Sequence, residues 1–116
     1  MKEEQLFTFI ETKVFTKQLD KIDFELLFVI QNDLITKPKR GDLIAGTNGV
    51  RKARVADKKS KRGKSGSYRY MYLYLENNGI IYLLVIFPKS KKANLDKSER
   101  NEIAQIARQI KNIYKE

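Results

Sequence analysis

Two neighbouring segments, residues 67–76 and 79–87, constrain the fold of this chain most strongly. Their sequences, SYRYMYLYLE and GIIYLLVIF, are rich in aromatic and β-branched residues and have the length of β-strands. The sequence ENNG joins them and is typical of a hairpin turn, because Gly79 can adopt a positive φ. The second segment is apolar on both faces, which indicates a central strand covered by other elements on each side.

Helical and extended patterns flank this hairpin. Residues 6–11 and 50–56 are predicted to be strands, and residues 40–50 a loop with a turn at Asn48–Gly49. A first helix is expected to begin at Thr12. A second helix is expected to be capped by Asp23 and to end near Pro38. Apolar residues recur at helical spacing in both: Val14, Phe15 and Leu19, then Leu26, Leu27, Ile30 and Leu34.

A third helix is predicted at the C-terminus. Asp96 and Glu99 have the spacing of a capping box, and isoleucines at 103, 106, 110 and 113 form an apolar stripe. The element order is therefore β-α-α-β-β-β-α. We expect one α+β domain over residues 1–116, with an antiparallel sheet, two N-terminal helices and a C-terminal helix.

The positive charge of the chain is confined to its middle. The formal charge is +10 for the whole sequence, and residues 37–69 hold twelve Lys/Arg against two Asp, so this window accounts for all of it. A localised basic patch is typical of proteins that bind nucleic acid, and less often of proteins that bind an anionic membrane.

The composition excludes several kinds of chemistry. The chain has no cysteine and no histidine, so disulfides, thiolates and the commonest metal ligand and general base are all missing. We therefore expect no metal and no cofactor. The first fifteen residues lack the pattern of a signal peptide, and the apolar run 80–87 is far shorter than the ~18 residues of a membrane span. These features predict a soluble, cytoplasmic protein.

The strand period places the basic residues on defined faces. Lys52 and Arg54 are expected on one face of their strand and Arg51 on the other, while Arg69 begins an otherwise apolar face. The simpler interpretation is that the strand charges are solvated, that residues 57–67 are a flexible basic loop, and that the tyrosine stripe is buried in the core. The alternative is that consecutive strands gather these cations at one end of the sheet. There they would bind a phosphate backbone, and Tyr68, Tyr70 or Tyr72 would stack on unpaired bases.

Three stretches resemble the RelE/ParE toxin superfamily. They are GDLIAGTNGVRKARVA (41–56), GKSGSYRYMYLYL (63–75) and IYLLVIFPKSKKANL (81–95). The first is similar to the Gly-Asp-x-Ile-x-Gly-Thr-Gly-Gly-Leu-Arg-Lys-like stretch of the HigB-type branch. The resemblance extends over residues 38–95, half of the chain.

The resemblance implies a RelE-like fold and a toxin of a type II toxin–antitoxin system. The implied activity is metal-independent, ribosome-dependent cleavage of messenger RNA in the A site, which inhibits translation. The implied partners are the ribosome, messenger RNA and a cognate antitoxin of the helix-turn-helix HigA type. DNA is contacted only through the toxin–antitoxin complex.

The resemblance also implies catalytic residues. Lys52 and Arg54 match the paired basic residues of the first central strand of the family. Arg69 matches the arginine of the glycine-tyrosine-arginine motif. Lys89 matches the basic residue that closes the last strand. The residues implied in RNA or ribosome binding are Arg51, Lys58, Lys59, Lys61, Arg62, Lys64 and Tyr68. Three positions depart from the pattern: Asn48 and Pro88 replace usual glycines, and Lys91 stands where many relatives have an acid.

The mechanism needs deprotonation of a 2′-OH, stabilisation of a phosphorane-like transition state and protonation of the leaving 5′-oxygen. The arginines suit the second task, since a guanidinium stays charged and binds phosphate in a bidentate way. The chain has no counterpart of the C-terminal tyrosine of some relatives, which leaves the general acid and base open between Lys52 and Lys89. A ParE-like gyrase poison and a non-catalytic RNA- or ribosome-binding module remain alternatives.

Overall fold

The computed structural model describes residues 6–56, 67–88 and 94–116. The elements follow the order β1 (Thr8–Glu11), α1 (Lys13–Asp20), α2 (Leu26–Thr36), β2 (Asp42–Leu43), β3 (Arg51–Ala56), β4 (Ser67–Leu75), β5 (Ile80–Pro88) and α3 (Lys97–Tyr114). The predicted α+β class and element order are confirmed, with the two-residue strand β2 as an addition.

The five strands form one sheet in the order β1-β5-β4-β3-β2. Strands β2 to β5 pair antiparallel, as predicted. Strand β1 differs, because it lies parallel to β5 at the edge of the sheet, with Thr8 opposite Ile80. The sheet is therefore mixed, a feature that the residue pattern of a single short strand does not encode.

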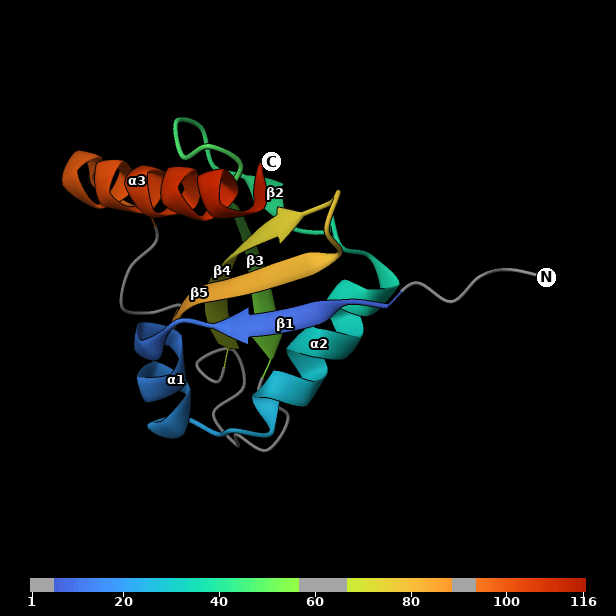
Figure 1. Cartoon of the computed structure of the whole chain (residues 1–116). Helices are drawn as coiled ribbons and strands as arrows, with labels where there is room; N and C mark the ends of the chain where they lie inside the picture. The colour runs from blue at the N-terminus through green and yellow to red at the C-terminus, as the bar shows by residue number, and fades with distance from the viewer. Residues whose placement is uncertain (1–5, 57–66, 89–93) are drawn as a thin grey trace.

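Helices cover both faces of the sheet (Figure 1). On one face α1 and α2 enclose a first core with the tyrosine face of β4. On the other face α3 encloses a second core with the face of β4 that carries Met71, Leu73 and Leu75. Strand β5 contributes to both, through Ile81 to the first and Leu84 to the second. The prediction that this strand is covered on each side is confirmed.

Local interactions explain where the helices begin. Thr12 caps α1 by accepting from the backbone N–H of Phe15 at 3.0 Å. Asp96 and Glu99 form the predicted capping box of α3. Asp23 accepts from the backbone N–H of Glu25 at 2.9 Å, so it closes a turn before α2 and does not directly precede the helix.

The loop between β2 and β3 depends on left-handed backbone conformations. Asn48 has a φ of 59° and Gly49 a φ of 101°. Asparagine tolerates this region better than most residues, which explains how Asn48 replaces the usual glycine. Its side-chain amide also donates to the carbonyl of Ala104 at 2.8 Å and so ties the loop to α3.

Candidate nucleic-acid interface

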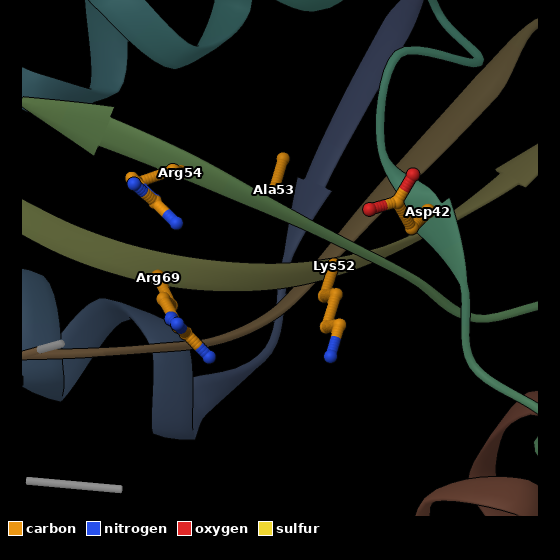
Figure 2. Close-up of a pocket in the computed structure, with 5 residues that line it drawn as sticks. All are labelled: Asp42, Lys52, Ala53, Arg54 and Arg69. Atoms are coloured by element: carbon orange, nitrogen blue, oxygen red, sulfur yellow. The ribbon is translucent and has the colours of Figure 1, made fainter. Parts of the chain in front are cut away.

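Three cations meet on the face of the sheet that also carries α3. Lys52 and Arg54 are two residues apart on β3, and Arg54 lies directly opposite Arg69 of β4 in the antiparallel register. We call these three residues the cationic cluster. They line a cavity of about 270 Å³ together with Asp42 and Ala53. Figure 2 shows the three side chains extending to the same side of β3 and β4, whereas Ala53 points to the other.

The cationic cluster lies where this face of the sheet becomes accessible. Met71 is buried beneath α3, but Arg69, two residues earlier on the same face, is only partly buried, and Arg54 is exposed. Like charges directly opposite one another disfavour an antiparallel pair, and an anion bound beside Arg54 and Arg69 would offset their mutual repulsion. The arrangement is suited to a phosphate, which accepts bidentate hydrogen bonds from guanidinium groups.

Two residues predicted to bind RNA lie on the opposite face. The guanidinium of Arg51 donates to the carbonyls of Gly41 at 2.7 Å and Lys39 at 3.2 Å, so it holds the segment before β2 against β3. Tyr68 is partly buried and packs against the first core. The structure therefore does not bring Arg51 or Tyr68 to the cationic cluster.

The remaining predicted site residues lie outside the described residues. Lys89 directly follows β5 in the sequence, and the basic loop joins β3 to β4. The loop cations in question are Lys58, Lys59, Lys61, Arg62 and Lys64.

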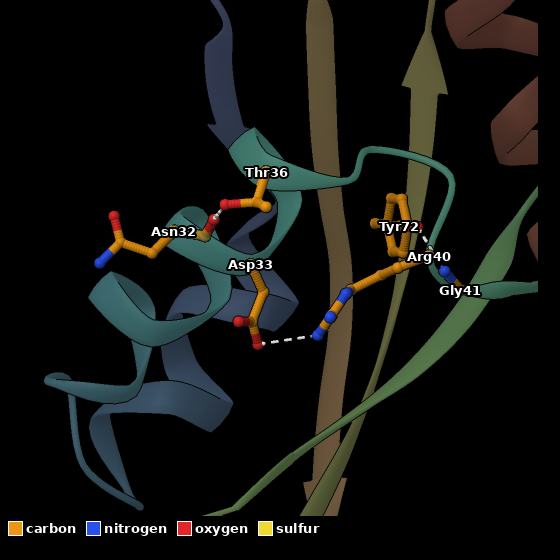
Figure 3. Close-up of polar contacts among 6 residues, drawn as sticks. All are labelled: Asn32, Asp33, Thr36, Arg40, Gly41 and Tyr72. Atoms are coloured by element: carbon orange, nitrogen blue, oxygen red, sulfur yellow. Dashed lines mark hydrogen bonds and ion pairs between the residues drawn. The ribbon is translucent and has the colours of Figure 1, made fainter.

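The tyrosine stripe of β4 is mainly core. Tyr70 and Tyr72 are completely buried, and burial raises the pKa of both phenols above the usual value. The Tyr72 hydroxyl accepts from the backbone N–H of Gly41 at 2.9 Å (Figure 3). It donates to the carbonyl of Pro38 at 2.8 Å. The simpler interpretation of these two tyrosines, inter-layer packing, is thus the one that the structure bears out.

Two charged residues beside the cluster were not singled out from the sequence. Asp42 lies directly opposite Lys52 in the pairing of β2 with β3 and lines the same cavity. Arg100 of α3 lines an adjoining cavity of about 200 Å³ with Lys52 and Met71. Asp42 stands in the motif GDLIAGTNG, but its relation to Lys52 depends on the pairing of β2, which is too short for a periodic signal.

The part of the chain that the structure describes offers few other chemical sites. Its His, Cys, Asp and Glu residues form no group of three or more that could hold a metal ion. Across residues 6–56, 67–88 and 94–116, no helix combines the length and apolar character needed to cross a bilayer.

Fold and site together define a small basic α+β protein whose sheet presents a cluster of cationic side chains. The family described as "RelE toxin of RelE / RelB toxin-antitoxin system" matches residues 34–116. That segment is well over half of the chain, so the chain belongs to the RelE toxin family, and a cognate antitoxin is its partner.

Two solved structures of E. coli RelE share this fold. A double arginine-to-alanine mutant in the free state has a TM-score of 0.56 and 12% sequence identity, over 86% of this chain and 95% of that one. The isolated toxin in a P21 crystal form has a TM-score of 0.54 and 13% identity, over 87% of this chain and 99% of that one. At these identities the likeness supports the RelE-like fold alone.

Proposed function

We propose that this toxin is a ribosome-dependent endoribonuclease of the HigB-type branch that cleaves messenger RNA in the A site and so inhibits translation. The observation that carries the proposal is the cationic cluster, in which two strands bring Lys52, Arg54 and Arg69 to one cavity. A nuclease needs such a cluster, whereas a gyrase poison does not. Membership of the RelE family supports the same activity, since toxins of this family are endoribonucleases.

The cluster divides the chemistry of RNA cleavage by residue type. Arg54 and Arg69 stabilise the negative charge that develops on the phosphorane-like transition state, because a guanidinium stays protonated and matches phosphate geometry. Lys52 takes part in proton transfer, with Lys89 as the second candidate. The absence of histidine and cysteine from the sequence is in keeping with a reaction that uses neither metal nor cofactor.

The ribosome supplies what the cluster lacks. In-line attack requires the 2′-oxygen, the phosphorus and the 5′-oxygen to be aligned, and correct orientation is worth several kcal/mol of the barrier. The described cations line a cavity of about 270 Å³, together with Asp42 and Ala53. The A site would hold the messenger in the reactive geometry, while the basic loop at 58–64 docks on ribosomal RNA.

The whole chain, residues 1–116, acts as one toxin domain in the cytoplasm. Its antitoxin is of the helix-turn-helix HigA type, and DNA is bound only by the complex of the two proteins.

The test is primer extension on a defined messenger, with and without 70S ribosomes, using the native protein and the variant Arg69→Ala. We expect cuts within A-site codons that require ribosomes, and a cleavage rate that falls by roughly 10²–10³ in the variant, as for removal of one preorganised charge donor. Arg108→Ala is the matched control, because it removes an exposed arginine of α3 that lies outside the cluster.

Two results would contradict the proposal. Cleavage by Arg69→Ala at the native rate would remove the cluster from the mechanism. Absence of cuts with the native protein, despite arrested growth on induction, would favour gyrase poisoning or non-catalytic binding to the ribosome.

A further inference from the structure

A groove of about 550 Å³ lies between α1 and α3, over the end of β5. Its walls are largely apolar: Val14 comes from α1, Phe87 from β5 and Ile106 from α3. Val14 and Ile106 are exposed and Phe87 is only partly buried, so three elements present apolar surface to solvent here. The size falls within the range of about 300–1,000 Å³ that holds small organic ligands.

The groove adjoins the cationic cluster. Phe87 lies directly opposite Arg69 in the antiparallel pairing of β4 with β5, so the two side chains are neighbours on one face of the sheet. Asn94 and Leu95 line both the groove and the cavity of about 200 Å³ that contains Lys52. An RNA strand with a phosphate at the cluster therefore has the groove within reach of an adjacent base.

Hydrogen bonds fix the walls of the groove relative to one another. The side-chain oxygen of Gln18 in α1 accepts from the backbone N–H of Ile86 at 2.9 Å. The hydroxyl of Thr12 donates to the carbonyl of Leu84 at 2.7 Å. On the other side, the capping box fixes the first turn of α3. The groove is therefore preformed, as is usual for sites that bind small ligands.

The charges of the groove disfavour a phosphate as its ligand. Among the described residues that line it, the charged side chains are those of Glu99 and Glu102 of α3. Carboxylates repel a phosphate and accept hydrogen bonds from N–H groups. The ring of Phe87 suits the face of an uncharged nucleobase, because bases stack on aromatic side chains. The groove is thus complementary to a base, and the cationic cluster to the phosphate beside it.

We propose that the groove binds the nucleobase next to the cleaved phosphate, and that Glu102 selects bases with an exocyclic amino group. Glu102 is exposed, whereas Glu99 already accepts from the backbone N–H of Asp96 in the capping box. Adenine, cytosine and guanine each carry an amino group that can donate to a carboxylate, and uracil carries none. The proposal rests on the proposed nuclease function, which places the RNA at the cluster.

The test is cleavage on programmed 70S ribosomes, with messengers that carry each of the four bases in turn on either side of the cleaved bond. We expect native kcat/KM to be about 10- to 100-fold higher with an amino-bearing base than with uracil, as for one hydrogen bond to a charged group. Glu102→Gln should reduce this preference to within about threefold, because an amide both donates and accepts. Phe87→Leu should lower kcat/KM for all the messengers by about tenfold, because it removes the stacking ring and keeps an apolar side chain.

Asp20→Asn is the matched control, because it removes the same charge from an exposed site at the end of α1 and should keep the native base preference. Titration of isotope-labelled protein with the four nucleoside 5′-monophosphates measures binding without cleavage. The NMR signals of Phe87 and Glu102 should shift more with AMP, CMP and GMP than with UMP.

Equal native rates for all four bases would overturn the assignment and leave the nuclease function in place, as would a native preference that Glu102→Gln retains. Weaker binding of the antitoxin by Glu102→Gln, with an unchanged base preference, would assign the groove to a protein segment instead. A native protein that leaves RNA intact on ribosomes would overturn the nuclease function, and the nucleotide titration would then decide the ligand of the groove on its own.

Discussion

At the scale of single residues, Gly41 sets the position of the strand that carries Asp42. A Cβ atom at this position would lie 2.8 Å from Cε1 of Tyr72 and 2.9 Å from the carbonyl oxygen of Lys52. The hydrogen bonds of Tyr72 and Arg51 to the backbone of Gly41 draw the chain to this distance. The absent side chain thus permits β2 to pair with β3 beside the cationic cluster.

We predict that Gly41→Ala lowers the free energy of unfolding by about 1–3 kcal/mol, because backbone and a buried ring must shift to admit the methyl group. Urea denaturation measures the change. Leu43→Ala is the control, since Leu43 is exposed and its truncation should change stability by less than about 0.5 kcal/mol. Equal stability of Gly41→Ala and the native protein would show that the close approach does not constrain this position.

At the scale of elements, the start of α3 depends on the capping box of Asp96 and Glu99. Asp96 accepts from the backbone N–H of Glu99 at 2.8 Å, and Glu99 accepts from the backbone N–H of Asp96 at 3.0 Å. The first turn also carries Arg100, which lines the cavity next to Lys52. Loss of the cap would therefore loosen the helix where it borders the site.

We predict that Asp96→Ala destabilises the protein by about 1 kcal/mol. For a chain of this size that corresponds to a fall in melting temperature of about 4 °C, measured by circular dichroism. Asp96→Asn is the control, because asparagine caps about as well as aspartate but carries no charge. If both variants lose the same stability, the interaction is with the helix dipole and not with the backbone N–H.

The sequence predicted the elements well and their arrangement less completely. Strong periodic signals identified α3 and the apolar β5 as elements that bury a face. The predicted stripe of α3 was right only in part, because Ile103 and Ile110 are buried together with Ala107, whereas Ile106 and Ile113 are exposed. The parallel direction of β1 was not accessible, because pairing direction depends on tertiary contacts across the sheet. The strand β2 has two residues and no period, so the approach of Asp42 to Lys52 could not be predicted. The shared face of Lys52 and Arg54 followed from the strand period alone.

At the scale of the whole molecule, positive charge and catalytic geometry are separable. Five of the twelve cations in residues 37–69 belong to the loop 58–64, and three form the cationic cluster. The cluster needs exact positions relative to the scissile phosphate. We expect the loop to supply long-range attraction, which depends on the number of phosphates neutralised and weakens with salt.

We predict that replacing the five loop cations with glutamine weakens ribosome binding and flattens its salt dependence. The slope of log Kd against log salt should fall by about 0.7–0.9 for each loop cation that contacts a phosphate. Single-turnover cleavage at saturating ribosomes should stay within a few-fold of the native rate, because the cationic cluster is intact. The positions to replace are Lys58, Lys59, Lys61, Arg62 and Lys64.

The control for this prediction is a variant with the same net charge and an intact loop. It replaces five exposed lysines outside the window with glutamine: Lys13, Lys17, Lys21, Lys97 and Lys115. Both variants carry five positive charges fewer than the native +10, so a non-specific field would weaken binding equally in the two. A docking loop would make the first variant bind more weakly, with the flatter slope, and equal salt slopes would instead assign ribosome attraction to the net charge of the whole protein.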